Sequence, residues 1–258
     1  MSRNFSLLQI VGKEQEYFQT GTDGPEPRVA AVPAPPPQVK LFPSALEESP
    51  HERSLRFEME AWQLEELTKL VQSVFLAPGT ESNRVVVLAS SESGNGCSWI
   101  CARAGELLAS QVAGRVCLVD ANFGRPTLHE HFGVANVGGL SDALRDEGSI
   151  GGYVSQLSRR NLALVSCGCD LQDTADLAAS ERMRLRLQEL RADFDYVLLD
   201  GASLDLGDDS IALGSMTDGI VVVLKTHSTR KERTRTRLQE LKSAGVRILG
   251  AVLNQPAC

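Results

Sequence analysis

One stretch of the sequence, residues 85–98, restricts what this chain can fold into more than any other. It reads VVVLASSESGNGCS, an apolar run, then a loop with Gly94 and Gly96, then Ser98 at the start of an amphipathic segment. A phosphate-binding loop needs glycines because successive backbone N–H groups point at the phosphates, and it needs a helix N-terminus whose dipole favours anions. The stretch therefore predicts a strand, a phosphate-binding loop and a helix, with the ligand held by Gly94, Asn95, Gly96, Cys97 and Ser98.

The loop departs from a working phosphate-binding loop at its charged position. The residue before the hydroxyl is normally lysine, which lies along the β- and γ-phosphates, and here it is Cys97. Ser91 likewise replaces the usual first glycine. The missing charge predicts a loss on the order of several kcal/mol of transition-state stabilisation, since electrostatics supplies most of phosphoryl-transfer catalysis. Lys225 or Arg103 could supply the charge; otherwise the loop binds nucleotide weakly or only connects strand to helix.

Composition narrows the class of protein. The chain has 258 residues, 42% of them hydrophobic and 23% charged, so it can bury one sizeable core and should form one main domain. Its formal net charge of −7 argues against nucleic acid and anionic membranes as partners. The sequence lacks the run of about 20 apolar residues of a membrane helix and the core of a signal peptide, so we expect a cytoplasmic protein. Its six cysteines are irregularly spaced, which predicts free thiols.

The chain divides into three segments. Residues 1–20 carry apolar side chains at roughly helical spacing, among them Phe5, Leu8 and Val11, which predicts a short amphipathic helix. A frayed tail would show the same spacing by chance. Residues 21–50 are rich in Pro, Gly and Ala, a composition typical of an extended linker. Residues 51–258 then form the domain that contains the loop.

Apolar strands and amphipathic helices alternate along this domain. The strands show no polar alternation, which predicts an α/β fold with a mainly parallel central sheet and helices on both faces. We expect strands beginning at residue 85 and over residues 116–120, 162–166, 196–200, 219–225 and 248–253, and helices over residues 52–76, 98–112, 179–191 and 231–244.

Polar residues gather where these strands end. Ligands bind at the carboxyl ends of parallel strands, so Asp120, Asp200, Asn254 and residues 167–169 should converge on the loop. Two strand-ending carboxylates favour a Mg²⁺ site that Ser98 completes. A cap or turn role for either carboxylate is the alternative.

Three further features allow more than one interpretation. Cys97, Cys101, Cys167 and Cys169 could form a thiolate metal or redox site, although cysteines more often serve as small buried hydrophobes. His129 and His131 bracket Glu130, where a surface or turn role is expected. The run 225–237 is rich in Lys, Arg and His, typical of a solvated helix face, and could also dock an acidic partner.

Four motifs in order resemble those of a known family. They are VCLVDANFGRPTLH at 116–129, AASERM at 178–183, FDYVLLD at 194–200 and the strand, helix, strand unit over 217–254. Together they resemble the bacterial tyrosine autokinases of exopolysaccharide synthesis and export, a branch of the MinD/ParA-type phosphate-loop (P-loop) ATPases. The resemblance covers residues 60–254.

The resemblance implies roles for particular residues. Asp120 would act on the nucleophile or the metal, Ser98 would ligate Mg²⁺, and Asp200 would hold that ion through water. It also implies ATP or ADP with Mg²⁺ as cofactors and assembly into oligomers. The expected partner is the cytoplasmic segment of a polysaccharide co-polymerase (chain-length determinant) or a kinase paralogue, which would recruit the chain to the inner membrane.

The departures from the family fall on functional positions. Besides Cys97, they are Asn122 for the second aspartate of the acidic motif, Gly124 for its arginine, and Ala202-Ser203 for the proline after Asp200. The chain has only three tyrosines, Tyr17, Tyr153 and Tyr196, and no tyrosine-rich tail, so tail autophosphorylation is not expected.

These departures predict a non-catalytic regulatory relative. The alternatives are an ATP-binding protein that retains ATPase or tyrosine-kinase activity through Asp120, Ser98 and Asp200, and a MinD/ParA-like positioning ATPase.

Overall fold

The computed structural model describes residues 3–8, 59–77, 83–169, 177–226 and 231–256. The linker predicted for residues 21–50 lies outside the described residues, as does most of the N-terminal segment. None of the helices in the described ranges combines the length and the apolar character needed to cross a lipid bilayer.

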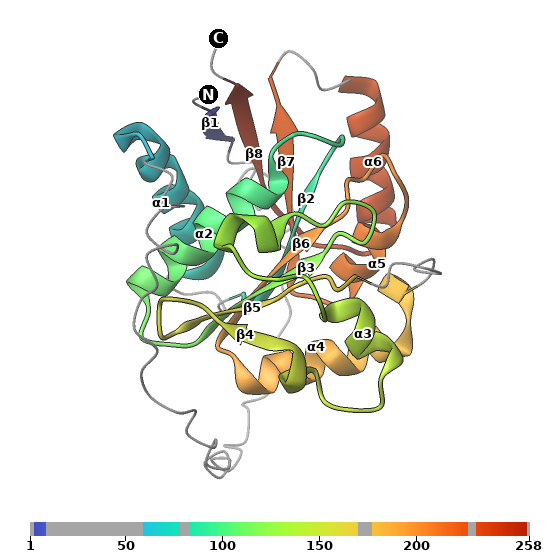
Figure 1. Ribbon diagram of the computed structural model, residues 1–258. Helices are drawn as coiled ribbons and strands as arrows, with labels where there is room; N and C mark the ends of the chain where they lie inside the picture. The colour runs from blue at the N-terminus through green and yellow to red at the C-terminus, as the bar shows by residue number, and fades with distance from the viewer. Residues whose placement is uncertain (1–2, 9–58, 78–82, 170–176, 227–230, 257–258) are drawn as a thin grey trace, which may run out of the picture.

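An eight-stranded sheet forms the centre of the fold (Figure 1). Its strands are β1 (Arg3–Leu8), β2 (Val85–Ser90), β3 (Val116–Ala121), β4 (Val154–Gln156), β5 (Leu162–Val165), β6 (Tyr196–Gly201), β7 (Gly219–Lys225) and β8 (Ile248–Pro256). They lie in the order β1-β8-β7-β2-β6-β3-β5-β4. The strands from β8 to β5 are parallel, and β1 and β4 are antiparallel edges. The predicted α/β fold with a mainly parallel sheet is confirmed.

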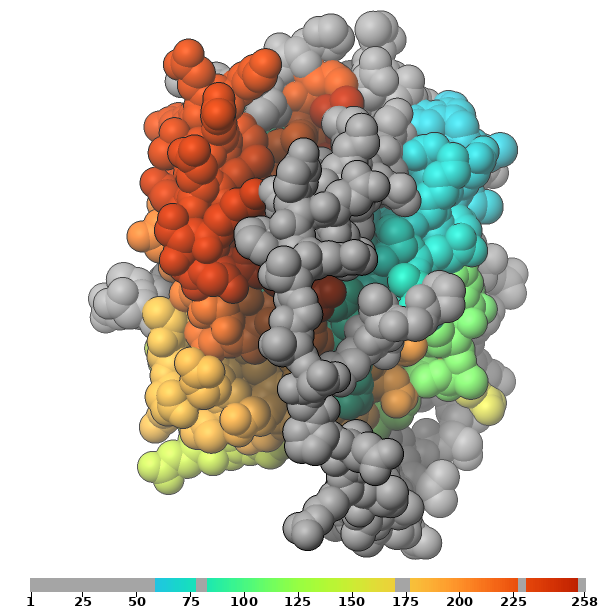
Figure 2. Space-filling model, turned by 180° about the vertical axis from the view of Figure 1, so that it is seen from behind, coloured from blue at the N-terminus to red at the C-terminus, as the bar shows by residue number. Residues whose placement is uncertain are grey.

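Helices cover both faces of this sheet. They are α1 (Ala61–Phe75), α2 (Cys97–Gln111), α3 (Leu140–Arg145), α4 (Glu181–Asp193), α5 (Asp209–Ser215) and α6 (Lys231–Ser243), with short 3-10 turns η2 (Leu128–Phe132), η3 (Ile150–Tyr153) and η4 (Leu177–Ala179). Helices α1 and α2 cover one face and α3 to α6 the other, and α1 and α6 lie on opposite sides of the molecule in Figure 2.

The continuous apolar runs of the strands follow from this double coverage. Along β2, Val85 and Val87 pack into the core beneath α3 to α6, whereas Val86 and Leu88 pack into the core beneath α1 and α2. Because successive side chains point to opposite faces, a strand that is buried on both faces is apolar along most of its length.

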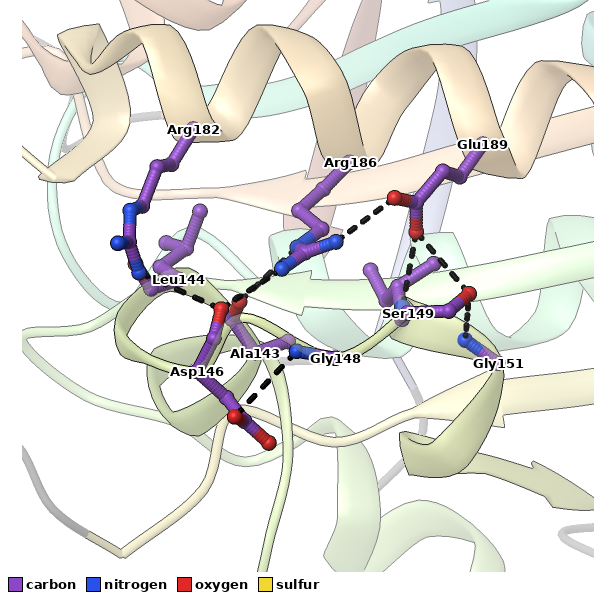
Figure 3. A network of polar contacts seen from close by, with 10 residues as sticks. Ala143, Leu144, Asp146, Gly148, Ser149, Gly151, Arg182, Arg186 and Glu189 are labelled. Carbon is purple, nitrogen blue, oxygen red and sulfur yellow. Dashed lines mark hydrogen bonds and ion pairs between the residues drawn. The ribbon is translucent and has the colours of Figure 1, made fainter.

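Arginine side chains of helix α4 hydrogen-bond to the end of α3 (Figure 3). The buried Arg186 donates to the carbonyl oxygens of Ala143 at 2.9 Å and Asp146 at 2.8 Å, and Arg182 donates to the same turn. Helix C-terminal carbonyls have no partner within their own helix. Glu189 balances the charge of Arg186 at 2.7 Å and accepts from the backbone at the start of η3. The contact fixes α3 and η3 against α4.

The prediction of a helix at the N-terminus is wrong for residues 3–8. They form β1, which pairs antiparallel with β8. The outer edge of β8 offers unpaired backbone groups, and pairing with them outweighs a weak helical spacing in a segment too short to be a stable helix. The helix predicted over residues 52–76 is confirmed from Ala61 to Phe75, and residues 52–58 lie outside the described ranges.

Candidate functional site

The glycine loop connects β2 to the N-terminus of α2, as predicted. Gly94 and Gly96 have φ of +81° and +85°, a region that residues with side chains rarely adopt. Gly96 is the N-cap residue of α2, and no side chain hydrogen-bonds there as a cap. A 15-residue helix thus directs its positive end at the loop. The backbone retains the features of an anion-binding loop.

Hydrogen bonds hold the loop to two neighbouring strands. The backbone N–H of Ser91 donates to the carbonyl of Val223 on β7 at 2.9 Å. The side-chain amide of Asn95 donates to the Ser91 hydroxyl at 3.1 Å, and its backbone carbonyl accepts from Nδ2 of Asn254 on β8 at 2.7 Å. Asn95 and Asn254 are both buried. The predicted convergence of Asn254 on the loop is therefore present, and the side chain of Asn95 serves to hold the loop.

The thiol that replaces the loop lysine is buried. Cys97 packs into the core beneath α1 and α2, beside Asp200. Burial, and then the negative charge of Asp200, raise the pKa of the Cys97 thiol well above its ordinary value. Burial raises the pKa of Cys101, one turn further along α2, in the same way. Both thiols stay neutral, so this position supplies no charge to a phosphate.

Asp200 has an unusual environment for a carboxyl group. It is fully buried, and neither oxygen has a hydrogen-bond partner of ordinary geometry within the described ranges. Burial, and then the charge of Asp120, raise the pKa of Asp200 to about 8, although the nearby Ser98 hydroxyl and Cys97 thiol act in the opposite direction. Asp200 thus binds a proton at neutral pH until a cation approaches it.

Asp120 lies directly opposite Asp200 but is hydrogen-bonded. Its Oδ2 accepts from the N–H of Leu128 at 2.9 Å, and its Oδ1 accepts from the N–H of Asn122 at 3.2 Å. Burial raises the pKa of Asp120 to about 6, and these two N–H groups limit the rise. Both oxygens of Asp120 thus hold the turn that follows β3.

The polar groups beside the loop fit a magnesium ion. Mg²⁺ is usually bound through one or two carboxylates, with water and phosphate oxygens completing the shell. In the described part of the chain, neither oxygen of Asp200 has a hydrogen bond of ordinary geometry. The Ser98 hydroxyl lies nearby, and Asp120 lies beside Asp200 in the sheet. Within the described ranges, this site included, no three His, Cys, Asp or Glu side chains come together to hold a metal without such added ligands. A thiolate metal centre has no support there.

The two basic residues considered as substitutes for the lysine lie in different places. Arg103 forms an ion pair with Glu106 at 2.6 Å and stacks 5.9 Å from the centre of the Phe132 ring. It is six residues after Cys97, about 9 Å along the axis of α2, so its charge is used away from the loop. Lys225 ends β7 at the register position of Asn254, at the same edge of the sheet as the loop.

Three further buried polar atoms lie at this edge of the sheet; the sequence reasoning placed Asn254 here but missed Ser203 and Thr226. The Ser203 hydroxyl, the Thr226 hydroxyl and Oδ1 of Asn254 are all buried, with no hydrogen-bond partner within the described ranges. Ser203 and Thr226 follow β6 and β7, and Asn254 lies near the end of β8, which was the available signal. Orphaned acceptors at the edge where ligands bind parallel sheets are typical of a site that a ligand completes.

The comparisons with known proteins agree with this geometry. No family model matches the chain. It is 28% identical over 169 residues to the tyrosine-protein kinase YwqD of Bacillus subtilis (strain 168), covering 66% of this chain and 71% of that protein. It is 26% identical over 191 residues to the tyrosine-protein kinase wzc of Salmonella typhi, covering 74% of this chain and 26% of wzc. The homologues of this chain are bacterial tyrosine-protein kinases.

A further relative is named for a polysaccharide. The present chain is 31% identical over 180 residues to the succinoglycan biosynthesis transport protein ExoP of Rhizobium meliloti (strain 1021), and the match covers 69% of this chain. It spans only 23% of ExoP and 26% of wzc, so those proteins contain much that this chain does not match.

Solved structures extend the likeness in fold. The kinase domain of the Escherichia coli tyrosine kinase ETK matches with a TM-score of 0.70 at 21% identity, over 75% of each chain. Cobyrinic acid a,c-diamide synthase from Mycobacterium smegmatis, with bound ADP and magnesium, matches with a TM-score of 0.53 at 19% identity, over 62% of this chain and 68% of that one. The predicted P-loop fold and its resemblance to bacterial tyrosine kinases are thus confirmed.

Proposed function

We propose that the chain is a tyrosine-kinase-like protein of exopolysaccharide biosynthesis that regulates a partner and does not transfer phosphate itself. The observation that carries the proposal is the buried, neutral thiol of Cys97 beside Asp200. Phosphoryl transfer depends on cations that stabilise charge on the transferred group. With a thiol there, the loop keeps its shape and loses its main electrostatic contribution.

The partner is the cytoplasmic segment of a polysaccharide co-polymerase or a catalytically active kinase paralogue. The support is the likeness to ExoP, a transport protein of succinoglycan biosynthesis, and the fold that the chain shares with a chimerical protein CapA2B2. The chain would reach the inner membrane through that partner and otherwise remain in the cytoplasm.

ATP or ADP with Mg²⁺ is the proposed ligand, bound weakly. The support is the glycine loop at the N-terminus of α2 and the two oxygens of Asp200 beside Ser98, which have no hydrogen bond of ordinary geometry within the described ranges. Backbone N–H groups would hold the phosphates, and Ser98 and Asp200 would face the ion, with Asp120 behind them. The bound ion would screen phosphate charge.

A second candidate function is an enzyme that retains ATPase or tyrosine-kinase activity. The position of Lys225 at the carboxyl end of β7, level with Asn254, favours it, because a lysine there could take over part of the missing charge. A MinD/ParA-like positioning ATPase rests on the shared fold alone and has no further observation in its favour.

Calorimetric titration with Mg-ATP, followed by turnover assays, separates these functions. We expect weak binding and no turnover for the natural chain, and about tenfold tighter binding for Cys97→Lys, because the lysine restores a positive charge beside the phosphates. Cys97→Met, which adds length without charge, is the matched control and should bind like the natural chain. Turnover of about 1–100 s⁻¹, typical of kinases, by the natural chain would refute the regulatory role, and its loss in Lys225→Met would then assign the charge.

A further inference from the structure

The N-terminal strand lies next to the strand that holds the loop. In the β1/β8 register, Phe5 stands opposite Asn254. Asn254 is the residue whose side chain donates to the backbone carbonyl of Asn95 at 2.7 Å. Phe5 and Asn95, some 90 positions apart in sequence, are thereby connected through Asn254 on β8.

The residues of β8 that follow Asn254 pair with β1. β7 ends at Lys225, level with Asn254, so in the described part of the sheet residues 255 and 256 pair only with β1, at Asn4 and Arg3. Without β1, β8 would become an edge strand, and its last residues would have no strand beside them. Strand ends without neighbours fray, and Asn254 would then stand at the beginning of the frayed end.

The direction of the backbone groups identifies which N–H groups of β1 matter. The carbonyl of Asn254 accepts from the N–H of Thr226, the residue that follows β7. Along a strand, the N–H and C=O of one residue point to one side, and those of the next residue point to the other. The N–H and C=O of Leu253 and Gln255 therefore face β1. Their register partners are Ser6 and Asn4. The N–H groups of these two residues therefore face β8.

The contact between Asn254 and Asn95 also orients the loop. The peptide bond between Asn95 and Gly96 is planar and trans, so its C=O and N–H point in opposite directions. Because Nδ2 of Asn254 holds the carbonyl, the N–H of Gly96 is turned to the opposite side. Gly96 is the N-cap of α2, where N–H groups meet an anion.

We infer that β1 is a positioning strand, which sets the shape of the loop over residues 91–97 through Asn254. Removal of β1 from β8 loosens the end of β8, weakens the hold of Asn254 on Asn95 and releases the peptide plane before Gly96. Any partner that takes up the N-terminal residues thus acts on the loop from outside the site. The inference holds whether or not the loop binds nucleotide.

Hydrogen exchange followed by mass spectrometry on the full chain tests this link. Asn4→Pro/Ser6→Pro removes the two N–H groups that face β8, and Asn4→Ala/Ser6→Ala changes the same side chains but keeps both N–H groups. We expect the Pro variant to exchange about tenfold faster at the hydrogen-bonded amides of Ser91 and Ile100, which donate to the carbonyls of Val223 and Gly96, and the Ala variant to match the natural chain. Asn254→Ala should reproduce the effect without touching β1.

The combination of the two changes gives the decisive comparison. If β1 acts through Asn254, the Pro variant combined with Asn254→Ala exchanges no faster in the loop than either alone. The inference is overturned if the Pro variant speeds exchange at Gln255 but leaves Ser91 and Ile100 unchanged, or if the two effects add fully. Exchange in α4, far from β1, reports whether each variant is still folded.

Discussion

Asp120 and Asp200 stand directly opposite one another in the register of β3 and β6, and both carboxyl groups are fully buried. Two acids so close in a low-dielectric setting cannot both ionise easily. Asp120 has two N–H donors and Asp200 has none of ordinary geometry within the described ranges. The proton therefore resides on Asp200, next to the position where Cys97 replaces the cation.

Asp200→Asn should remove a pH-dependent loss of stability. The pKa of Asp200 is raised to about 8, so between pH about 4 and 8 the folded state binds more protons than the unfolded state, and the free energy of unfolding falls as pH rises. Asparagine resembles the protonated acid. We expect the variant to gain about 2–4 kcal/mol over the natural chain at pH 8 and almost nothing at pH 4, in urea unfolding without nucleotide. Equal slopes against pH for both proteins would contradict this.

Asp218→Asn should lower the free energy of unfolding, whereas Asp200→Asn should raise it. Asp218 accepts from the N–H groups of Arg84 at 2.7 Å and Val85 at 2.8 Å and pairs with Arg191 at 2.8 Å. Burial opposes the charge most strongly, but Arg191 and these N–H groups outweigh it and lower the pKa of Asp218. The carboxylate thus stabilises the fold above its ordinary pKa, and this contribution disappears as pH falls through the lowered value. We expect the variant to lose about 1–3 kcal/mol at pH 7 in urea unfolding, and less in acid.

Exposed Asp193 at the end of α4 provides the control for both substitutions. Asp193→Asn should change the free energy of unfolding by no more than about 0.5 kcal/mol at either pH. A shift as large as that of Asp218→Asn would mean that net charge, and not the local partners, sets the result.

Cys97→Lys should flatten the pH profile of the ligand-free chain. A lysine beside Asp200 favours the ionised carboxyl group and lowers its pKa, so less stability is lost between pH 4 and 8. Cys97→Met adds similar bulk without charge and should keep the steeper profile. The measurement is the free energy of unfolding at the two pH values, and identical profiles for the two variants would refute the pairing of position 97 with Asp200.

Arg186→Met should destabilise the chain by about 3 kcal/mol in urea unfolding. The change removes the donors to the carbonyls of Ala143 and Asp146 and leaves Glu189 without its ion-pair partner (Figure 3). Arg184→Met, two residues earlier on the same helix, breaks an ion pair with Glu181 at the surface and should cost at most about 1 kcal/mol. Equal losses would show that the contact with α3 contributes nothing beyond a surface pair.

Local patterns in the sequence were enough to predict most of the fold. Nearly continuous apolar runs such as 219–225 identify buried strands, because a strand covered on both faces buries the side chains on either side of it. Gly94, Gly96 and Ser98 identify the loop, since its backbone conformation depends on the residues within it. The absence of the lysine at position 97 is likewise a fact of the sequence alone.

Contacts between distant segments required the tertiary structure. Residues 3–8 carry a weak helical spacing, but the open edge of β8 makes them a strand. The spacing of residues in the sequence did not predict that Arg103 forms an ion pair with Glu106. It also did not predict that Lys225 stands opposite Asn254 in the register of β7 and β8. Nor could it tell that Asp200 is left with a proton while Asp120 holds a turn, because a pKa depends on burial and neighbours that only the assembled sheet provides. The sequence thus determined which residues reach the site, and the packing of the strands decided their charge and partners.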